Sequence, residues 1–283
     1  MTNGKLIFDV GANDGVDTAY YLGLGHAVVA IEADPVLCDG LRDRFTEETA
    51  DRRVIVVNAA VMEEDRDAVA LYVCKDNTES SLIRLMAERS GRLAGRIMVR
   101  GRSLCSLFSE YGLPWYCKID IEGYDAQAVS GMTGCDGRPA YISCEGTGQP
   151  IGEIGRDERL LYLVLDALAA RGYRQFKLVD QESLLVLADA GHYDRLHRWP
   201  ARMRTKLERW TSRPTPRRNN RLWLARRGLP EAGSVSGPFG EALEGEWASY
   251  AVTRQRMIRH FSHYYRYTKN KQNIFWVDIH GKY

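Results

Sequence analysis

Short strand patterns alternate with helical patterns through the first two thirds of the chain. Runs with the length and β-branched content of strands occur at residues 5–10, 27–31, 54–57, 116–121, 141–144 and 173–179. Between them, Asp34 followed by Pro35 predicts the N-cap of a helix over residues 35–48, and Ser103 predicts a second N-cap. Strands separated by helices predict an α/β fold, a mostly parallel Rossmann-like sheet with helices on both faces.

The pattern changes after residue 190 and divides the chain into three parts. We expect residues 1–190 to form the ligand-binding α/β domain and residues 191–240 to form a basic, aromatic insertion or cap. Residues 241–283 are expected to supply a C-terminal helix and strand that pack on the core or the substrate pocket.

The basic stretch at residues 195–227 contains about a dozen Lys and Arg residues but only one acid, Glu208. Three interpretations remain open for it. It is a solvated surface or subunit contact, a lid for an anionic substrate such as a nucleotide-activated or phosphorylated sugar, or a nucleic-acid surface.

Composition narrows the cellular setting. No apolar run approaches the roughly 20 residues of a membrane span, and residues 1–5 lack the features of a signal peptide. We therefore expect a cytoplasmic protein without a membrane span. The cysteines show no C-x-x-C spacing, so we expect reduced, mostly buried thiols and no metal site. They are Cys38, Cys74, Cys105, Cys117, Cys135 and Cys144.

A glycine-rich turn follows the first predicted strand, where residues 8–15 read FDVGANDG. Glycines let the backbone turn sharply and let a ligand approach closely. The turn leads into a helix N-terminus, whose free N–H groups can bind ligand atoms. Asp9 ends the first strand, and Glu32 ends the second about 20 residues later, where an acid accepts hydrogen bonds from ribose hydroxyls. These features predict a nucleoside cofactor.

The turn departs from the dinucleotide pattern G-x-G-x-x-G, because Asn13 and Val16 occupy the second and third glycine positions. The acid at Asp9 suits a cationic ligand end, such as the ammonium of S-adenosylmethionine, directly or through water. The sequence therefore favours S-adenosylmethionine, with S-adenosylhomocysteine as the product. A non-catalytic module that only keeps the fold is an alternative, and the intact Asp9 and Glu32 argue against it.

Several segments together resemble the FkbM-type methyltransferases. They are FDVGANDG at residues 8–15, AIEADP at 30–35, NAAV at 58–61, SSL at 80–82 and KIDIEGYDAQAVSGM at 118–132. The segment GPFGEALEGEW from Gly237 and the terminal WVDIH are similar to segments of some bacterial relatives. The resemblance implies a class I methyltransferase sheet and methyl transfer to a hydroxyl oxygen of a sugar, glycan or natural-product small molecule.

The resemblance also implies roles for single residues. The methionine end of the cofactor would be held by the turn residues Asp9, Gly11, Ala12, Asn13 and Gly15. Glu32 would bind the ribose, and Asn58 and Ala59 would lie near the adenine. Many relatives have a segment before the first motif that helps to close the pocket. Here we expect the C-terminal region, or a second subunit of a homo-oligomer, to cover the cofactor.

Catalytic candidates follow from the strand ends. A base that takes the hydroxyl proton accelerates such a transfer roughly 10²–10⁴-fold. Carboxyl ends of parallel strands face the ligand crevice, which favours Asp120 and then Glu145. Histidine is the usual proton acceptor near neutral pH, and we favour His280, which follows Asp278, before His263.

Substrate contacts are predicted for Ser81, Glu122 and His263. Each of them also has a structural interpretation, as a turn residue, a cap of the next turn or a packed side chain. An RNA methyltransferase that uses the basic stretch is the alternative function. Amino-directed nucleic-acid enzymes carry a (D/N)-P-P-(Y/F/W) motif after the fourth strand, and residues 120–123 read DIEG, so we do not expect a nucleic-acid partner.

Overall fold

The chain is described by a computed structural model. The structure describes residues 4–75, 80–89, 93–146, 149–181, 185–187, 236–267 and 275–283. The basic stretch at residues 195–227, for which three interpretations were open, lies outside these residues.

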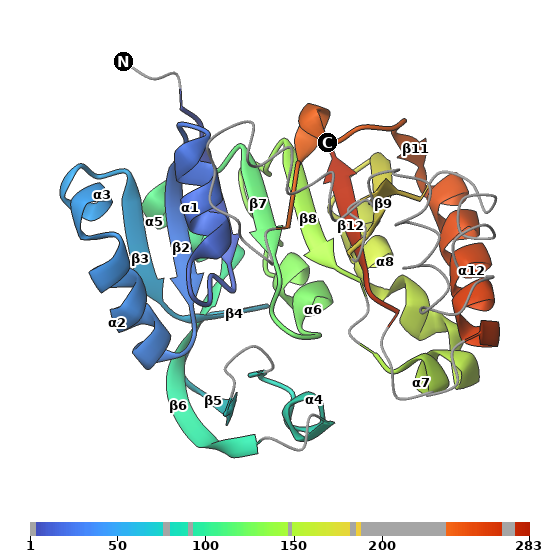
Figure 1. Cartoon of the computed structure of the whole chain (residues 1–283), viewed down its shortest axis with the longest axis horizontal. Coiled ribbons are helices and arrows are strands. Elements are labelled where there is room, and N and C mark those ends of the chain that lie inside the picture. The colour runs from blue at the N-terminus through green and yellow to red at the C-terminus, as the bar shows by residue number, and fades with distance from the viewer. Residues whose placement is uncertain are drawn as a thin grey trace, which may run out of the picture.

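A large central sheet has the strand order β10-β9-β12-β8-β7-β1-β2-β3 (Figure 1). Its strands are β1 (Leu6–Val10), β2 (Ala27–Glu32), β3 (Val54–Asn58), β7 (Tyr116–Ile119), β8 (Tyr141–Glu145), β9 (Gln175–Asp180), β10 (Leu185–Val186) and β12 (Val277–Lys282). The short β11 (Ala248–Ser249) also pairs with β9. The run from β3 to β8 is parallel and has the 3-2-1-4-5 order of a Rossmann fold, which confirms the predicted fold class.

Helices cover both faces of this sheet. Phe8 and Val10 point to one face, and Ile7 and Asp9 point to the other, because side chains alternate along a strand. The first face is packed by α5 (Leu104–Tyr111), α6 (Asp125–Ser130) and α8 (Leu163–Ala170). The second face is packed by α1 (Val16–Gly23) and α2 (Pro35–Arg44). Beyond the β9 edge lie α7 (Ile151–Arg156), the 3-10 turn Glu158–Tyr162 and α12 (Tyr250–Tyr267).

A small second sheet lies below the carboxyl ends of the central strands in Figure 1. It has the strand order β4-β6-β5, and one short helix, α4, contacts β5. Its elements are β4 (Ala60–Met62), β5 (Arg66–Cys74), α4 (Arg84–Arg89) and β6 (Leu93–Ser103). Its apolar contacts are made by Ala60, Leu71 and Val99. The small sheet therefore forms a wall beside the edge at which ligands of α/β proteins bind.

Both predicted helix caps are confirmed. Asp34 accepts a hydrogen bond from the Val36 amide at 2.8 Å, and Ser103 accepts one from the Ser106 amide at 3.2 Å. The single helix predicted over residues 35–48 is wrong, because it divides at Phe45 into α2 and α3 (Thr46–Ala50). Phe45 leaves the helical conformation at φ −111°, ψ 35°, and its ring packs against the glycine turn.

The C-terminal part of the chain completes the sheet. β12 pairs antiparallel with β8 on one side and β9 on the other. The segment 236–249, which includes the 3-10 turn Gly240–Ala242, covers the α1 face of the sheet. Phe239 of this segment stacks on Tyr116 with ring centroids 4.1 Å apart. Residues 236–249 and 277–282 thus contribute a covering segment and a strand to the central sheet.

No helix in the described ranges has both the length and the apolar character that crossing a bilayer demands.

Candidate active site

The glycine turn after β1 packs against the segment that follows β7. Gly11, Asn13 and Gly15 have positive φ angles of 78°, 49° and 80°. A Cβ atom at Gly11 would lie 1.9 Å from the carbonyl oxygen of Asp120, so no larger residue fits there. The Gly11 and Ala12 amides both donate to the Ile31 carbonyl, at 2.9 and 3.1 Å. The ends of β1, β2 and β7 are therefore held together at one place.

Glu32 joins the end of β2 to the same turn. One carboxylate oxygen accepts the Asn13 amide and the other accepts the Asp34 amide, both at 2.9 Å. Burial raises the pKa of Glu32, and these two amides oppose the rise. A carboxylate has about four acceptor sites, so Glu32 retains acceptors for further hydroxyl donors. This arrangement fits the predicted ribose contact.

Asn58 and Ala59 follow β3 beside Glu32. The Asn58 side-chain amide donates to the carbonyls of Glu32 and Ala33 at 3.0 and 2.9 Å. Ala59 is buried, and its amide donates to the Glu32 carbonyl at 3.0 Å. Both residues thus shape the turn after β2, next to which the adenine is expected.

A buried lysine connects three acids beneath the turn. The Lys118 ammonium lies 3.6 Å from Asp9, 3.0 Å from Asp17 and 3.4 Å from Asp120, measured to carboxylate oxygens. Asp9 has no exposed surface and also accepts a hydrogen bond from Thr18 at 2.6 Å. We call these four charged residues, Asp9, Asp17, Lys118 and Asp120, the Lys118 cluster.

The Lys118 cluster has an excess of negative charge. Three carboxylates and one ammonium give a net charge of −2 when all are ionised. Burial raises the pKa of Asp9 to about 6, with Lys118 opposing this and Asp17 adding to it. Burial disfavours the charge of Lys118, but the three acids outweigh it and raise the pKa of its ammonium. Such a cluster attracts a cationic ligand and repels a pyrophosphate, so the residues present fit S-adenosylmethionine.

A row of polar residues crosses the sheet at the level of Asp9. Strand register aligns neighbours in the order Asp9, Lys118, Ser143, His280 and Lys177. His280 is 2% exposed, and burial together with Lys177 lowers its pKa to about 3, so its imidazole is neutral at physiological pH. The structure places His280 inside the sheet and not at its carboxyl edge.

The next row of side chains toward the carboxyl edge is acidic. Asp278 pairs with Glu145, and Asp125 accepts a hydrogen bond from the Glu145 amide at 3.1 Å. Burial raises the pKa of Asp125 and of Asp278 well above the usual value, and neighbouring acids add to it. Asp120 is the accessible member, with a side chain 37% exposed. We call Asp120, Asp125, Glu145 and Asp278 the acidic edge.

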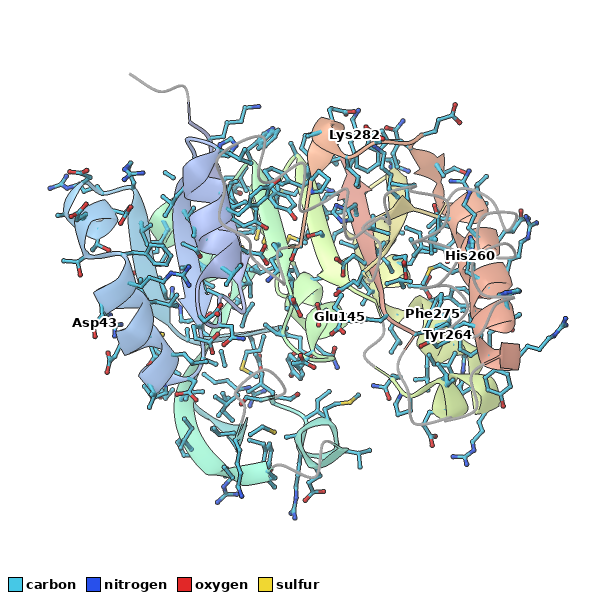
Figure 2. All side chains as sticks on the ribbon, in the orientation of Figure 1. Asp43, Glu145, His260, Tyr264, Phe275 and Lys282 are labelled. Carbon is cyan, nitrogen blue, oxygen red and sulfur yellow. The ribbon has the colours of Figure 1, made fainter. Side chains whose placement is uncertain are left out.

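Figure 2 shows Glu145, the last residue of β8, at the lower edge of the sheet and Lys282, the last residue of β12, at the upper edge. The acidic edge thus lies on the side that carries the small sheet. Among the described residues, no group of three or more His, Cys, Asp or Glu side chains is arranged to hold a metal ion.

Ser81 and Glu122 meet beside the acidic edge. The buried Ser81 hydroxyl donates to the Glu122 carbonyl at 2.9 Å, which ties the small sheet to the turn after β7. Glu122 and Gly123 have positive φ angles of 53° and 88°. This turn ends β7 at Ile119, two residues before the predicted strand end.

His263 belongs to a different part of the molecule. It lies half-buried on α12, whose main packing partners are β9, α7 and α8. The structure therefore brings together Asp120, Glu145, Ser81 and Glu122, but it places His263 on a helix beyond the β9 edge of the sheet.

Sequence analysis did not assign a role to Lys118, Asp17 or Asp125. A signal for Lys118 exists, because a lysine in an apolar strand requires acidic partners, and Asp120 lies two residues further on the same face. No local signal indicated Ser236, whose amide and hydroxyl donate to Asp17 at 2.7 and 2.8 Å. That contact joins positions more than 200 residues apart, so Ser236 can be recognised as the partner of Asp17 only in the folded chain.

The fold and the site define the class of this protein. A 3-2-1-4-5 parallel sheet with an inserted antiparallel strand, a glycine turn, and acids at the ends of β1 and β2 are the features of a Rossmann-like class I methyltransferase domain, which binds S-adenosylmethionine. A sequence model described as the Methyltransferase FkbM domain matches residues 9–175. The chain belongs to the FkbM methyltransferase family.

Three solved structures to which this chain is similar are distant from it in sequence. An FkbM methyltransferase from Methylobacillus flagellatus KT is 18% identical with a TM-score of 0.43, over 63% of this chain and 40% of that one. The precorrin-6y C5,15-methyltransferase of Geobacter metallireducens GS-15 is 12% identical with a TM-score of 0.34, over 64% and 70%. An O-methyltransferase from Bacillus cereus in complex with SAH is 15% identical with a TM-score of 0.36, over 62% and 67%.

The alignment with the Methylobacillus protein therefore spans less than half of that protein's length. No curated protein matches this chain significantly.

Proposed function

We propose that the protein methylates a hydroxyl oxygen of a neutral, polyhydroxylated small molecule or glycan. The observation that carries the proposal is Asp120, a partly exposed carboxylate whose backbone packs against the glycine turn and whose neighbours on the sheet edge are acids. Oxygen as the acceptor atom is also the expectation that comes from the resemblance to FkbM enzymes.

The cofactor would lie across the glycine turn. When bound, S-adenosylmethionine supplies an electrophilic methyl group. Glu32 would accept hydrogen bonds from the ribose, and the turn residues 11–15 would hold the methionine end. Asp9 is fully buried, so it would act on the ligand from beneath, through the negative field of the Lys118 cluster. Asn58 would keep the turn after β2 in shape.

Asp120 would accept the proton of the substrate hydroxyl. Its carboxylate lies 3.4 Å from the Lys118 ammonium, which would hold it in place. Asp125 and Asp278 have raised pKa values and would hold protons. Asp120 is preferred to His280 because His280 lies one residue pair deeper in the sheet and is nearly inaccessible.

The acidic edge also bears on the substrate. Negative charge next to the reacting hydroxyl would repel a phosphate or carboxylate group placed there. A neutral sugar or polyol meets no such repulsion and offers hydroxyls to the carboxyl groups. The nucleic-acid alternative depends on the basic stretch at residues 195–227, and no described residue favours it.

Two measurements test the proposal in sequence. Calorimetry with S-adenosylmethionine tests cofactor binding, and its failure would favour a non-catalytic module. Incubation with methyl-labelled cofactor and a panel of neutral and phosphorylated sugars then tests the acceptor, with NMR locating the methylated atom.

The variant Asp120→Asn should keep its cofactor affinity and lose turnover by about 100-fold or more. Unchanged turnover in this variant would exclude Asp120 as the base.

A further inference from the structure

Two of the six cysteines differ from the rest. Cys38, Cys74, Cys117 and Cys144 are buried, whereas Cys105 and Cys135 are partly exposed. The side chains of Cys105 and Cys135 lie close enough to each other that Cys105 raises the pKa of the Cys135 thiol. The Cys105 amide also donates to the Gly131 carbonyl at 3.1 Å, which fixes the start of α5 against the loop that carries Cys135. The fold thus creates a thiol pair between positions 30 residues apart in the sequence.

The two thiols have different surroundings. Cys105 is the second residue of α5, next to the N-cap Ser103, where helix amide groups favour negative charge. Burial raises the pKa of Cys135 to about 12, the neighbouring Cys105 adds to this rise, and Arg171 opposes it. Because the pKa of Cys135 is raised, we assign the first attack on a peroxide to Cys105 and the second step to Cys135.

A cavity lies on the Cys135 side of this pair. Cys135 lines a cavity of about 160 Å³ together with Arg138 and Arg171. The Arg171 guanidinium donates to the Thr133 hydroxyl at 2.6 Å and remains at the cavity wall. A space of this size holds several water-sized molecules, so a hydroperoxide can approach the pair from the Cys135 side.

We propose that Cys105 and Cys135 are a redox modification site that a peroxide converts into a disulfide. The Cys105 thiolate attacks the O–O bond of the peroxide, forming a sulfenic acid and releasing hydroxide or an alkoxide that takes up a proton. The Cys135 thiol then displaces the sulfenic oxygen as water, which forms the S–S bond. Two thiols are oxidised, one peroxide is reduced, and a thiol reductant reverses the change.

The disulfide would close a loop that contains the central strand β7. Constraining the unfolded chain in this way stabilises the folded state. We expect the oxidised protein to have a Tm roughly 5–10 °C above that of the reduced protein. The same measurement on Cys105→Ser should show no difference between peroxide-treated and reduced samples.

The direct test identifies the bonded sulfurs. The purified full-length protein is treated with hydrogen peroxide, free thiols are alkylated, and non-reduced peptides are analysed by mass spectrometry. Trypsin and chymotrypsin are used together, because cleavage after Tyr116 and after Tyr141 separates Cys105 from Cys117 and Cys135 from Cys144. We expect a Cys105–Cys135 peptide and the loss of two of the six thiols.

Variants separate the two roles. Cys135→Ser should stop the reaction at the sulfenic acid, which dimedone traps at Cys105, and Cys105→Ser should form neither product. Cys38→Ser, at a buried cysteine, is the control and should still form the bond. Six unreacted thiols at a peroxide concentration that oxidises a free peptide thiol would overturn the proposal. So would a disulfide between any other pair.

Discussion

Lys118 places a full positive charge inside the sheet, where most proteins have an apolar residue. Its side chain is 7% exposed and is surrounded by Asp9, Asp17 and Asp120. Burying one charge without partners is costly, but here three carboxylates surround the ammonium. The lysine links Asp9, beneath the glycine turn, to Asp120, the proposed base, and Asp17 extends the link to Ser236.

Replacing Lys118 tests whether these charges are present in the folded state. Lys118→Met leaves buried carboxylates without a counter-charge, so we expect a loss of about 3–5 kcal/mol in the free energy of unfolding, measured by urea denaturation. Arg42→Met removes an exposed ion pair with Asp39 and should cause no measurable loss. If Lys118→Met unfolds at the same urea concentration as the parent, the cluster holds protonated acids and no ion pairs.

Asp9 predicts how cofactor binding depends on pH. Its pKa of about 6 lies above the usual 3.8, so the carboxylate becomes protonated and loses its charge as the pH falls through 6. Affinity for a cationic cofactor should therefore be about tenfold lower at pH 5 than at pH 7. Calorimetry at both pH values measures this ratio.

The isosteric variant Asp9→Asn is the matched comparison for that experiment. It carries no titrating group at this position, so its affinity should be low and nearly equal at pH 5 and pH 7. Asp43→Asn, on the exposed side of α2, should retain the pH dependence of the parent. If Asp9→Asn still binds the cofactor about tenfold more weakly at pH 5 than at pH 7, the titration belongs to another acid of the site.

At the scale of elements, the segment 236–249 is an unusual cover for a sheet face because little of it is helical. Ser236 is anchored on α1, Phe239 lies between aromatic rings, and the Leu243 carbonyl accepts a hydrogen bond from Lys177 at 2.6 Å. Trp247 then packs over the Lys177 ammonium at 4.3 Å. These contacts follow the row of buried polar residues across the sheet.

Phe239 is the apolar anchor of this segment. It is 4% exposed, stacks on Tyr116 and meets Tyr21 edge-on. Phe239→Ala should lower the free energy of unfolding by about 3–5 kcal/mol, because the cavity between the rings cannot close. Val36→Ala, at a site 73% exposed on α2, should change it by less than about 0.5 kcal/mol. Equal effects of the two substitutions would mean that the segment is not packed as described.

Local signals in the sequence predicted local structure well. Asp34 before Pro35 identified a cap because capping depends only on neighbouring residues, and the glycine turn was recognisable from its own letters. The break of the helix at Phe45 was not predictable in this way. It depends on a ring that packs against Gly15, a contact across 30 residues.

Long-range pairing limited the prediction of the site in the same way. Asp120 and Glu145 were found because strand ends share an edge, which is a general rule of parallel sheets. Asp278 was noted only as a possible partner of His280, since nothing in WVDIH shows that this strand pairs with β8. The position of His280 inside the sheet follows from the same pairing and could not be predicted from the sequence either.

At the scale of the whole molecule, the order of strands in space differs from their order in the chain. β12 is the last strand of the sequence but lies between β8 and β9. It pairs along its full length with β9, and from Asp278 to Lys282 with β8. Without it, two buried strands would have unpaired edges in the middle of the sheet.

A fragment ending at residue 187 should therefore fail to fold. We expect it to show no cooperative thermal transition by circular dichroism, although it contains the whole of the matched family domain. A chain that ends at Lys282, and so lacks only the 65% exposed Tyr283, is the control and should melt like the parent. A cooperative transition in the shorter fragment would show that β8 and β9 can pair directly.

The position of β12 also has a consequence during protein synthesis. A nascent chain emerges from the ribosome in sequence order, so the strands on either side of the gap are complete long before the one that fills it. Until β12 has been synthesised, two open strand edges are exposed to other nascent chains and to chaperones. A ribosome that stalls after β9 and before β12 would therefore hold the protein in its most aggregation-prone form.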